Sequence, residues 1–243
     1  MREWLVRLEG ERLDLEEASF HFRTADWEVR QEDDGYYLAS ADFTSMTESG
    51  AVLKRGKQLL KVMNGILKLQ CWNYQPVAAH GSVVRVDEAG NRNQYIHVAG
   101  AATARARVRA AAVVVKPNGT TELPLQQPTQ AASWMAMARR DDKVGSALGL
   151  FAEPTLVKLS NILDAIERDV GGERALVDKR WVAQGEIERF TATVNCMEAA
   201  GDDARHGPRG FKAPKRPMSL REAQDLFGAL LNKWLETKAI DCK

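Results

Sequence analysis

The 243-residue chain is poor in cysteine and histidine, with three cysteines and four histidines. Cys71, Cys196 and Cys242 are far apart and form no CxxC pair, so the sequence predicts no zinc site. Thiols in this arrangement are typical of a reducing compartment, which favours the cytoplasm. We expect each cysteine to be a small buried or incidental apolar residue, and we expect no metal and no cofactor.

Long apolar runs are also absent. No stretch approaches the roughly 18 apolar residues that a membrane span requires. The first residues, MREWLVRLEGERLDLEE, alternate charged with apolar side chains and lack the apolar run of a signal peptide. The sequence therefore predicts a soluble cytoplasmic protein with no membrane partner.

An excess of charge of one sign is the third absence, since the formal net charge is +1. A nucleic acid would have to be bound by a local patch, because the chain as a whole provides no attractive field. No phosphate-binding glycine loop, pair of catalytic carboxylates or Ser-His-Asp set is found either. The acidic pairs Asp141-Asp142 and Asp202-Asp203 have no second cluster at ligand spacing, so a metal site is not predicted.

The chain has what an ordinary globular protein needs: 44% hydrophobic and 28% charged residues. Its length suits one large domain or two of ordinary size. Three segments are predicted from the residue patterns: an antiparallel α+β domain over 1–122, a linker or short helix over 123–149, and a helical domain over 150–243.

The first of these segments shows the period-two alternation of strands from Trp4 to about Phe43. From about Gly50 to Gln70 the apolar residues change to a helical period, which predicts one amphipathic helix covering the sheet. Further strands are predicted over Val83–Val86, Tyr95–Val98 and Ala104–Val115. This pattern indicates the α+β class with an antiparallel sheet.

Between Leu123 and Gly149 the periodicity is lost, apart from a short helix expected around Trp134 to Arg140. Beyond residue 150 every signal is helical. We expect a helix that has Pro154 in its first turn and is stopped by Gly171-Gly172, and another over Gln184–Asn195. A last helix should begin at a capping box formed by Ser219 and Glu222 and run to about Lys238.

The helical half also carries a distinctive set of motifs. IERFTATVN at 187–195 is followed by GDDARHG at 201–207 and by PMSLREAQDLFGALLNKWLE at 217–236. These motifs resemble a family of bacterial proteins with the pattern RF..T.N…G..ARHG…PM.L.EA, which is similar to the HEPN superfamily, including its Apea-like antiphage members. The resemblance covers about residues 150–240, and its most specific pieces are Asn195, Arg205-His206 and the start of the PMSLREA helix.

The resemblance implies a helical bundle that forms a homodimer and cleaves RNA without a metal ion, as a toxin or antiviral defence effector. His206 would then be the acid or base, Arg205 would stabilise the charged phosphorane, and Asn195 would orient the substrate or the histidine. One histidine supplies one of the two proton transfers, and a symmetric dimer would bring in the second. The same loop offers cations for phosphates and a ring for a base: Arg209, Phe211, Lys212, Lys215 and Arg216.

A non-catalytic interpretation stays open beside this one. Arg205 would then pair with Asp202 or Asp203, His206 would support a turn, and the lysine-rich stretch would be a solvated loop. Under this alternative the chain is an RNA- or protein-binding module that dimerises through its helical half.

Two more arginine patterns lie in the first half. RNQYIH has the Arg-x4-His spacing from Arg92 to His97, but it lies in a predicted hairpin, and we interpret it as a chance match. In TARARVRA a strand would place Arg105, Arg107 and Arg109 on one face, with neighbours roughly 6.6 Å apart. That row would suit RNA or a nucleotide effector and make this domain a sensor or substrate collar. The interpretation we favour is an ordinary solvated sheet face.

Overall fold

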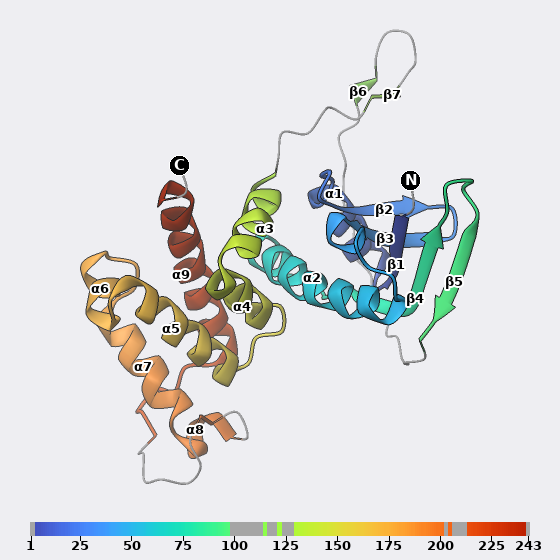
Figure 1. Ribbon diagram of the computed structural model, residues 1–243. Helices are drawn as coiled ribbons and strands as arrows, with labels where there is room; N and C mark the ends of the chain where they lie inside the picture. The colour runs from blue at the N-terminus through green and yellow to red at the C-terminus, as the bar shows by residue number, and fades with distance from the viewer. Residues whose placement is uncertain are drawn as a thin grey trace. The chain divides into compact units, whose positions relative to one another are not determined.

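The computed structural model describes residues 3–97, 114–115, 121–122, 129–201, 204–205 and 213–241. The chain divides into two compact units, residues 1–67 with 73–136 and residues 68–72 with 137–243, called here the N-terminal unit and the helical unit. An antiparallel sheet dominates the first unit and helices build the second, so the predicted α+β class is confirmed (Figure 1).

The sheet of the N-terminal unit has five strands in the order β2-β3-β1-β4-β5, and every neighbouring pair is antiparallel. Their bounds are β1 Glu3–Glu9, β2 Trp27–Glu32, β3 Gly35–Ser40, β4 Ala78–Val86 and β5 Arg92–Ile96. Two short strands, β6 Val114–Val115 and β7 Thr121–Glu122, pair separately. Most of the predicted strand Ala104–Val115 lies outside the described residues.

One prediction for this unit was wrong, because a helix interrupts the strands expected between Trp4 and Phe43. Helix α1 spans Arg12–His21 and buries Leu15, Ala18 and Ser19. The segment RLDLEEA consists mainly of good helix formers, and its buried residues are three and four apart rather than two. The alternation in β1 does not continue into it.

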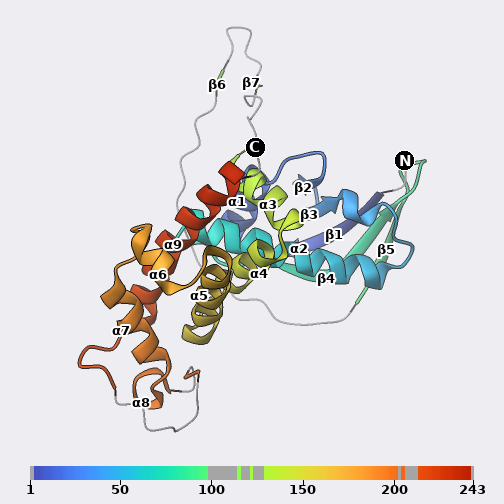
Figure 2. The same cartoon turned by 60° about the vertical axis from the view of Figure 1, so that its left-hand side comes forward.

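Helix α2, Ser49–Gln70, confirms the predicted amphipathic helix and lies against one face of the sheet (Figure 1; Figure 2). Its approach is close at Gly56, where an added Cβ would lie 2.9 Å from Val6 Cγ2. Val6 is fully buried on the central strand β1. The missing side chain at position 56 therefore sets the spacing between helix and sheet.

A buried amide fixes the chain that follows α2. Asn64 donates from Nδ2 to the carbonyl of Val77 at 2.8 Å, and its Oδ1 accepts from the Tyr74 hydroxyl at 2.7 Å and from Val77 N–H at 3.1 Å. Asn64 and Tyr74 are both buried. This neutral network satisfies buried polar groups between α2 and the start of β4.

The helical unit contains the end of α3 (Gln130–Arg140) and then α4 Asp142–Phe151, α5 Leu156–Val170, α6 Glu173–Asp178, α7 Gln184–Val194, α8 Met197–Ala200 and α9 Leu220–Asp241. The predicted stop of α5 is confirmed: Gly171 has a left-handed φ of 100°. The predicted capping box is also present, because Ser219 N–H donates to Glu222 and Glu222 N–H donates to Ser219 Oγ.

Two helix predictions for this unit need correction. The 123–149 segment was expected to be a linker with one short helix, yet α4 begins inside it, capped by the Asp141 carboxylate on the N–H groups of Lys143 and Val144. Gly145 and Gly149 obscure its pattern in the sequence. Pro154 was placed in the first turn of α5, but the N-cap is Thr155, so the proline precedes the helix.

A charge network joins α4, α5 and α9. Lys238 Nζ lies 2.8 Å from both Asp141 Oδ2 and Asp169 Oδ2, and Asp169 also accepts from Lys143 and from Trp234 Nε1. Although burial raises the pKa of Asp169, hydrogen bonds from Lys238, Lys143 and Trp234 lower it to about 2. No helix in the described part of the chain is both long and apolar enough to cross a membrane.

Candidate functional site

Asn195 and Arg205, ten residues apart in the sequence, lie at the same end of α7. Asn195 is the C-cap residue of that helix. The backbone N–H of Arg205 donates to the carbonyl of Val194 at 2.8 Å, after the short helix α8 has turned the chain back. The structure thus brings together two of the three residues that the sequence predicts as catalytic, and His206 lies outside the described residues.

The side chain of Arg205 is held against α5. Its Nη1 donates to Ser160 Oγ at 3.1 Å, and its Nη2 donates to Asp164 Oδ2 at 2.7 Å. Ser160 is buried, whereas the Arg205 side chain is 36% exposed. The carboxylate partner is therefore Asp164 on α5; the suggested partners Asp202 and Asp203 lie outside the described residues.

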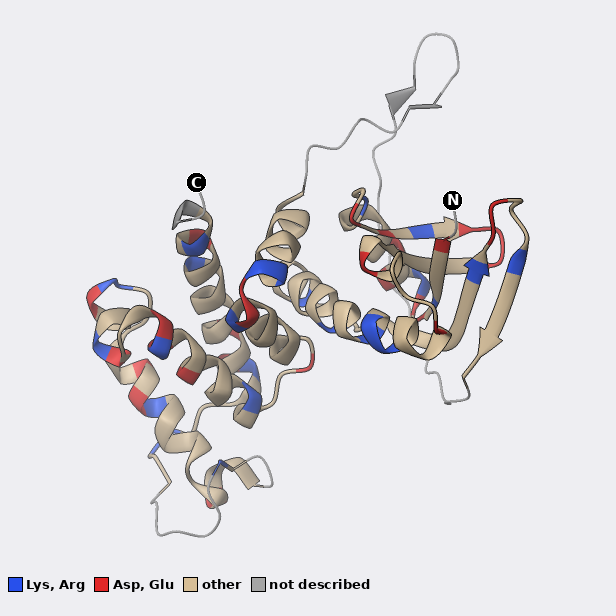
Figure 3. Cartoon of the chain, in the orientation of Figure 1, with Lys and Arg blue, Asp and Glu red and all other residues tan. Residues whose placement is uncertain are grey.

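Further charged residues on α5 and α6 lie near the Arg205–Asp164 ion pair. Burial raises the pKa of Glu167, and the nearby carboxylates of Glu173 and Asp164 raise it further, while Arg205 lowers it in part. Acidic and basic residues lie side by side along this part of the helical unit (Figure 3). Arg205 thus lies beside several carboxylates and shares Asp164 with Arg168, so its own charge is partly neutralised.

The chain between α8 and α9, called here the site loop, is attached to α7 at its other end by Arg189. Its Nε donates to the carbonyl of Arg216 at 2.9 Å, and its Nη2 donates to the carbonyl of Pro217 at 3.1 Å and to Glu222 Oε1 at 2.8 Å. The bond from Arg189, with those from Ser219, lowers the pKa of Glu222 to about 2. Arg189 therefore links α7, the chain before α9, and the first turn of α9.

Thr193 adds a buried contact to this attachment. Its Oγ1 accepts from Met218 N–H at 2.9 Å and donates to the carbonyl of Arg189 at 2.8 Å. Thr193 is fully buried. The chain between α8 and α9 is consequently attached to α5 and α7 near Arg205, and to α7 near Met218.

Asn195 contributes an acceptor at this helix end. Its Oδ1 is buried and has no hydrogen-bond partner among the residues that the structure describes. A buried amide oxygen without a partner is costly, so it is suited to accept from a group that the described residues do not supply.

The remaining predicted binding residues divide into two groups. Lys215 and Arg216 are exposed, and the Arg216 side chain, 83% exposed, reaches Glu222 at 3.6 Å. The other predicted residues lie outside the described part of the chain: Arg209, Phe211, Lys212, Arg105, Arg107 and Arg109.

The RNQYIH segment has structural partners of its own. Arg92 forms an ion pair with Glu32 and lies over the ring of Tyr37, 5.1 Å from its centroid. His97 Nε2 is 3.1 Å from Ser49 Oγ. Both side chains therefore contact the sheet or α2 of the N-terminal unit.

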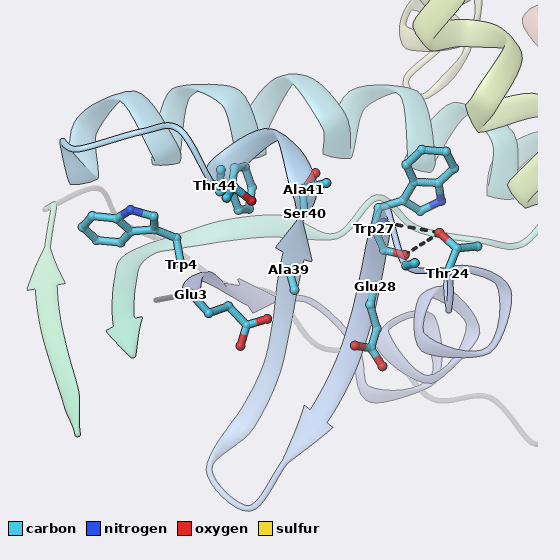
Figure 4. A pocket seen from close by; sticks show the side chains of 11 residues that line it. Glu3, Trp4, Thr24, Trp27, Glu28, Ala39, Ser40, Ala41 and Thr44 are labelled. Carbon is cyan, nitrogen blue, oxygen red and sulfur yellow. Dashed lines mark hydrogen bonds between the residues drawn. The ribbon is translucent and has the colours of Figure 1, made fainter. Parts of the chain in front are cut away.

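A cavity of about 240 Å³ opens at one end of the sheet in the N-terminal unit. Trp4 and Trp27 lie on either side of the end of β3, while Glu3 and Glu28 extend from the opposite side of their strands (Figure 4). Glu3 is paired with Arg30 at 2.6 Å.

Within the described residues, no group of three or more His, Cys, Asp or Glu side chains could hold a metal ion.

Sequence reasoning missed the residues that hold the site in place. Arg189 and Thr193 belong to the quoted IERFTATVN motif, and their presence in it was the available signal. Ser160 is a polar residue within the apolar stripe of α5, which is a weaker signal. Asp164 gave none, since a single carboxylate on a charged helix face is ordinary.

Comparisons with family models, curated proteins and solved structures found no match for this chain.

Proposed function

We propose that the chain is a metal-independent endoribonuclease of the HEPN-like kind, with its site on the loop that leaves the end of α7. The observation that carries the proposal is the hydrogen bond from Arg205 N–H to Val194, which brings Arg205 beside Asn195. These residues are the most specific pieces of the motif resemblance. His206 follows Arg205 directly in the sequence.

In the proposed reaction the 2′-hydroxyl of a ribose attacks the adjacent phosphorus and its proton passes to a base. The bond from phosphorus to the 5′-oxygen then breaks, and an acid protonates that oxygen. His206 performs one of these transfers, and His206 of a second copy performs the other. Asn195 orients the substrate or the histidine through its buried amide.

The contacts of Arg205 change the role first expected of it. A guanidinium has five N–H donors, and Ser160 and Asp164 engage both terminal nitrogens. Arg205 therefore acts first as a positioning residue that holds the loop on α5. Its remaining donors and its partial exposure let it contact a phosphate as well.

The test is incubation of the purified chain with total cellular RNA in excess EDTA, with wild type beside His206→Ala and Arg205→Ala. His80→Ala is a matched control, because His80 is exposed on β4 in the other unit. Arg174→Ala controls for arginine loss, since its side chain is 86% exposed on α6 and pairs with Asp178, away from the site residues. We expect cleavage by wild type and both controls, and loss of cleavage in His206→Ala.

A second candidate function is a non-catalytic RNA- or protein-binding module that dimerises through its helical half. The observation that favours it is the Arg205–Asp164 pair, which gives Arg205 a purely structural task. Intact RNA in every lane would favour this module. Retained RNA binding that weakens in Lys215→Gln with Arg216→Gln would then identify RNA as its ligand.

A further inference from the structure

The two edges of the five-stranded sheet are finished in different ways. On the β2 edge, the chain just before the strand runs alongside it: Val29 N–H donates to the carbonyl of Phe22 at 2.8 Å, and Thr24 N–H donates to the carbonyl of Trp27 at 3.0 Å. Charged residues alternate along β2 as well, at Glu28, Arg30 and Glu32. Both features protect an edge from pairing with another strand.

The β5 edge has neither protection within the described part of the chain. All five residues of Arg92–Ile96 are exposed, and the strand contains no proline and no glycine. Its one charge, on Arg92, is paired with Glu32, so most of the strand is uncharged (Figure 3). Ile96 is 72% exposed, the highest value among the exposed large hydrophobic residues.

The ladder with β4 shows which backbone groups point outward. At one end Asp87 N–H donates to the carbonyl of Asn91, and at the other His97 N–H donates to the carbonyl of Gly81. Antiparallel pairs alternate between bonded and non-bonded positions. Asn93 and Tyr95 therefore bond to β4, while Arg92, Gln94 and Ile96 direct N–H and C=O groups away from the sheet.

These outward groups are self-complementary. If a second copy of β5 lies antiparallel with Gln94 facing Gln94, then Arg92 faces Ile96 of the second copy, and Asn93 faces its Tyr95. No like charges meet in this register, and Arg92 can keep its contacts with Glu32 and Tyr37. The twofold arrangement gives about six backbone hydrogen bonds.

We propose that β5 is a self-association surface, through which two copies of this chain pair antiparallel about Gln94 into one continuous sheet. The strand is short, so the contact is small compared with standard interfaces, and the association is weak and depends on concentration. The proposal rests on the N-terminal unit alone and is independent of the ribonuclease proposal.

The first test is amide hydrogen exchange on the full chain, followed residue by residue by NMR from about 10 µM to about 1 mM, a range that covers weak association. We expect the amides of Arg92, Gln94 and Ile96 to exchange severalfold more slowly at the high concentration. The amides of Asn93 and Tyr95 should not change, since they bond to β4 at every concentration. Equal exchange of all five amides at both concentrations would overturn the proposal, even if the chain dimerises through its helical half.

The second test compares Gln94→Pro with Gln94→Thr by sedimentation equilibrium. Both substitutions remove the side-chain bond from Gln94 to Ser82 Oγ, and proline removes in addition only an outward N–H, so the fold should remain, as circular dichroism would check. We expect Gln94→Pro to weaken self-association about tenfold or more, because two hydrogen bonds cross the centre of the contact. Gln94→Thr keeps the N–H and should associate like wild type. Unchanged association of Gln94→Pro refutes the proposal, and the exchange experiment decides the matter if that variant does not fold.

Discussion

Each unit of the molecule fixes a loop to a helix, but the two units use different chemistry. In the N-terminal unit, the buried neutral amide of Asn64 holds Tyr74 and Val77. In the helical unit, the charged groups of Arg189 and Asp164 hold the two ends of the site loop near the surface. A neutral network does not respond to salt, whereas a partly exposed ion pair is weakened by it. The loop of the N-terminal unit should therefore stay attached at any salt concentration, whereas high salt should loosen the site loop of the helical unit.

The largest effect is expected from Asn64→Ala, which tests the neutral side of this comparison. The variant removes the hydrogen bonds that Asn64 makes inside the core with the Val77 N–H and carbonyl and with the Tyr74 hydroxyl. We expect the free energy of unfolding to fall by about 3 kcal/mol or more, measured by urea denaturation. The loss should be the same in low and high salt.

Tyr74→Phe is the matched control, since it removes a single bond to Asn64. A loss of about 1 kcal/mol is expected there. If Asn64→Ala proved as mild as Tyr74→Phe, the amide would not be what fixes this loop.

The next effect tests whether a mostly buried ion pair can stabilise the fold as strongly as the buried amide of Asn64. Lys238 is 20% exposed and bonds to two carboxylates, so Lys238→Met leaves both Asp141 and Asp169 without their main partner. We expect a loss of about 2 kcal/mol in unfolding free energy, from the penalty of unpaired charge. Lys143→Met is the control: its side chain is 56% exposed with one bond, and it should cost less than about 1 kcal/mol.

A smaller effect is expected at the loop attachment itself. Arg189→Met keeps an apolar stem but removes the bonds to Arg216, Pro217 and Glu222. The expected loss is about 1–2 kcal/mol, reduced in high salt because Glu222 is a charged partner. Arg189→Lys keeps the charge without the planar fork, and it should fall between wild type and Arg189→Met. A salt-independent loss would contradict the contrast drawn between the two units.

The last effect is a dependence of stability on pH. The folded pKa of Asp169, about 2, lies below its usual value of 3.8, so its stabilisation is present above about pH 4 and is lost as pH falls towards 2. Asp169→Asn should therefore be less stable than wild type at pH 7, and the two thermal unfolding curves should converge near pH 2. A constant difference between them at every pH would show that the charge of Asp169 is not what stabilises the helical unit.

Segments with a clear local pattern predicted their helices and helix ends correctly, whereas segments with mixed patterns did not. The apolar stripe of α2, the glycine stop after α5 and the Ser219–Glu222 box each depend on local chemistry that a sequence displays directly. Helix α1 was missed because a short charged segment next to a strand imitates alternation. Helix α4 was missed because its cap, Asp141, is followed by two glycines that weaken the pattern.

The candidate site shows the same division. The motif spacing predicted Asn195 and Arg205 as members of one site, and the bond from Arg205 to Val194 places both at the end of α7. The partner of Arg205 could not be predicted, because Asp164 lies 41 residues earlier in the chain. Contacts across such a distance depend on how α5 packs beside α7, which no local pattern encodes.

Gly56 on α2 and Val6 on the central strand β1 face each other across the same space between helix and sheet. A methyl group at position 56 would lie 2.9 Å from Val6 Cγ2, so alanine there would force the helix or Val6 to shift. The same space can be divided differently, with a smaller residue on the strand and a larger one on the helix. Among sequences that adopt this fold, the sizes of residues 6 and 56 should therefore vary in opposite directions.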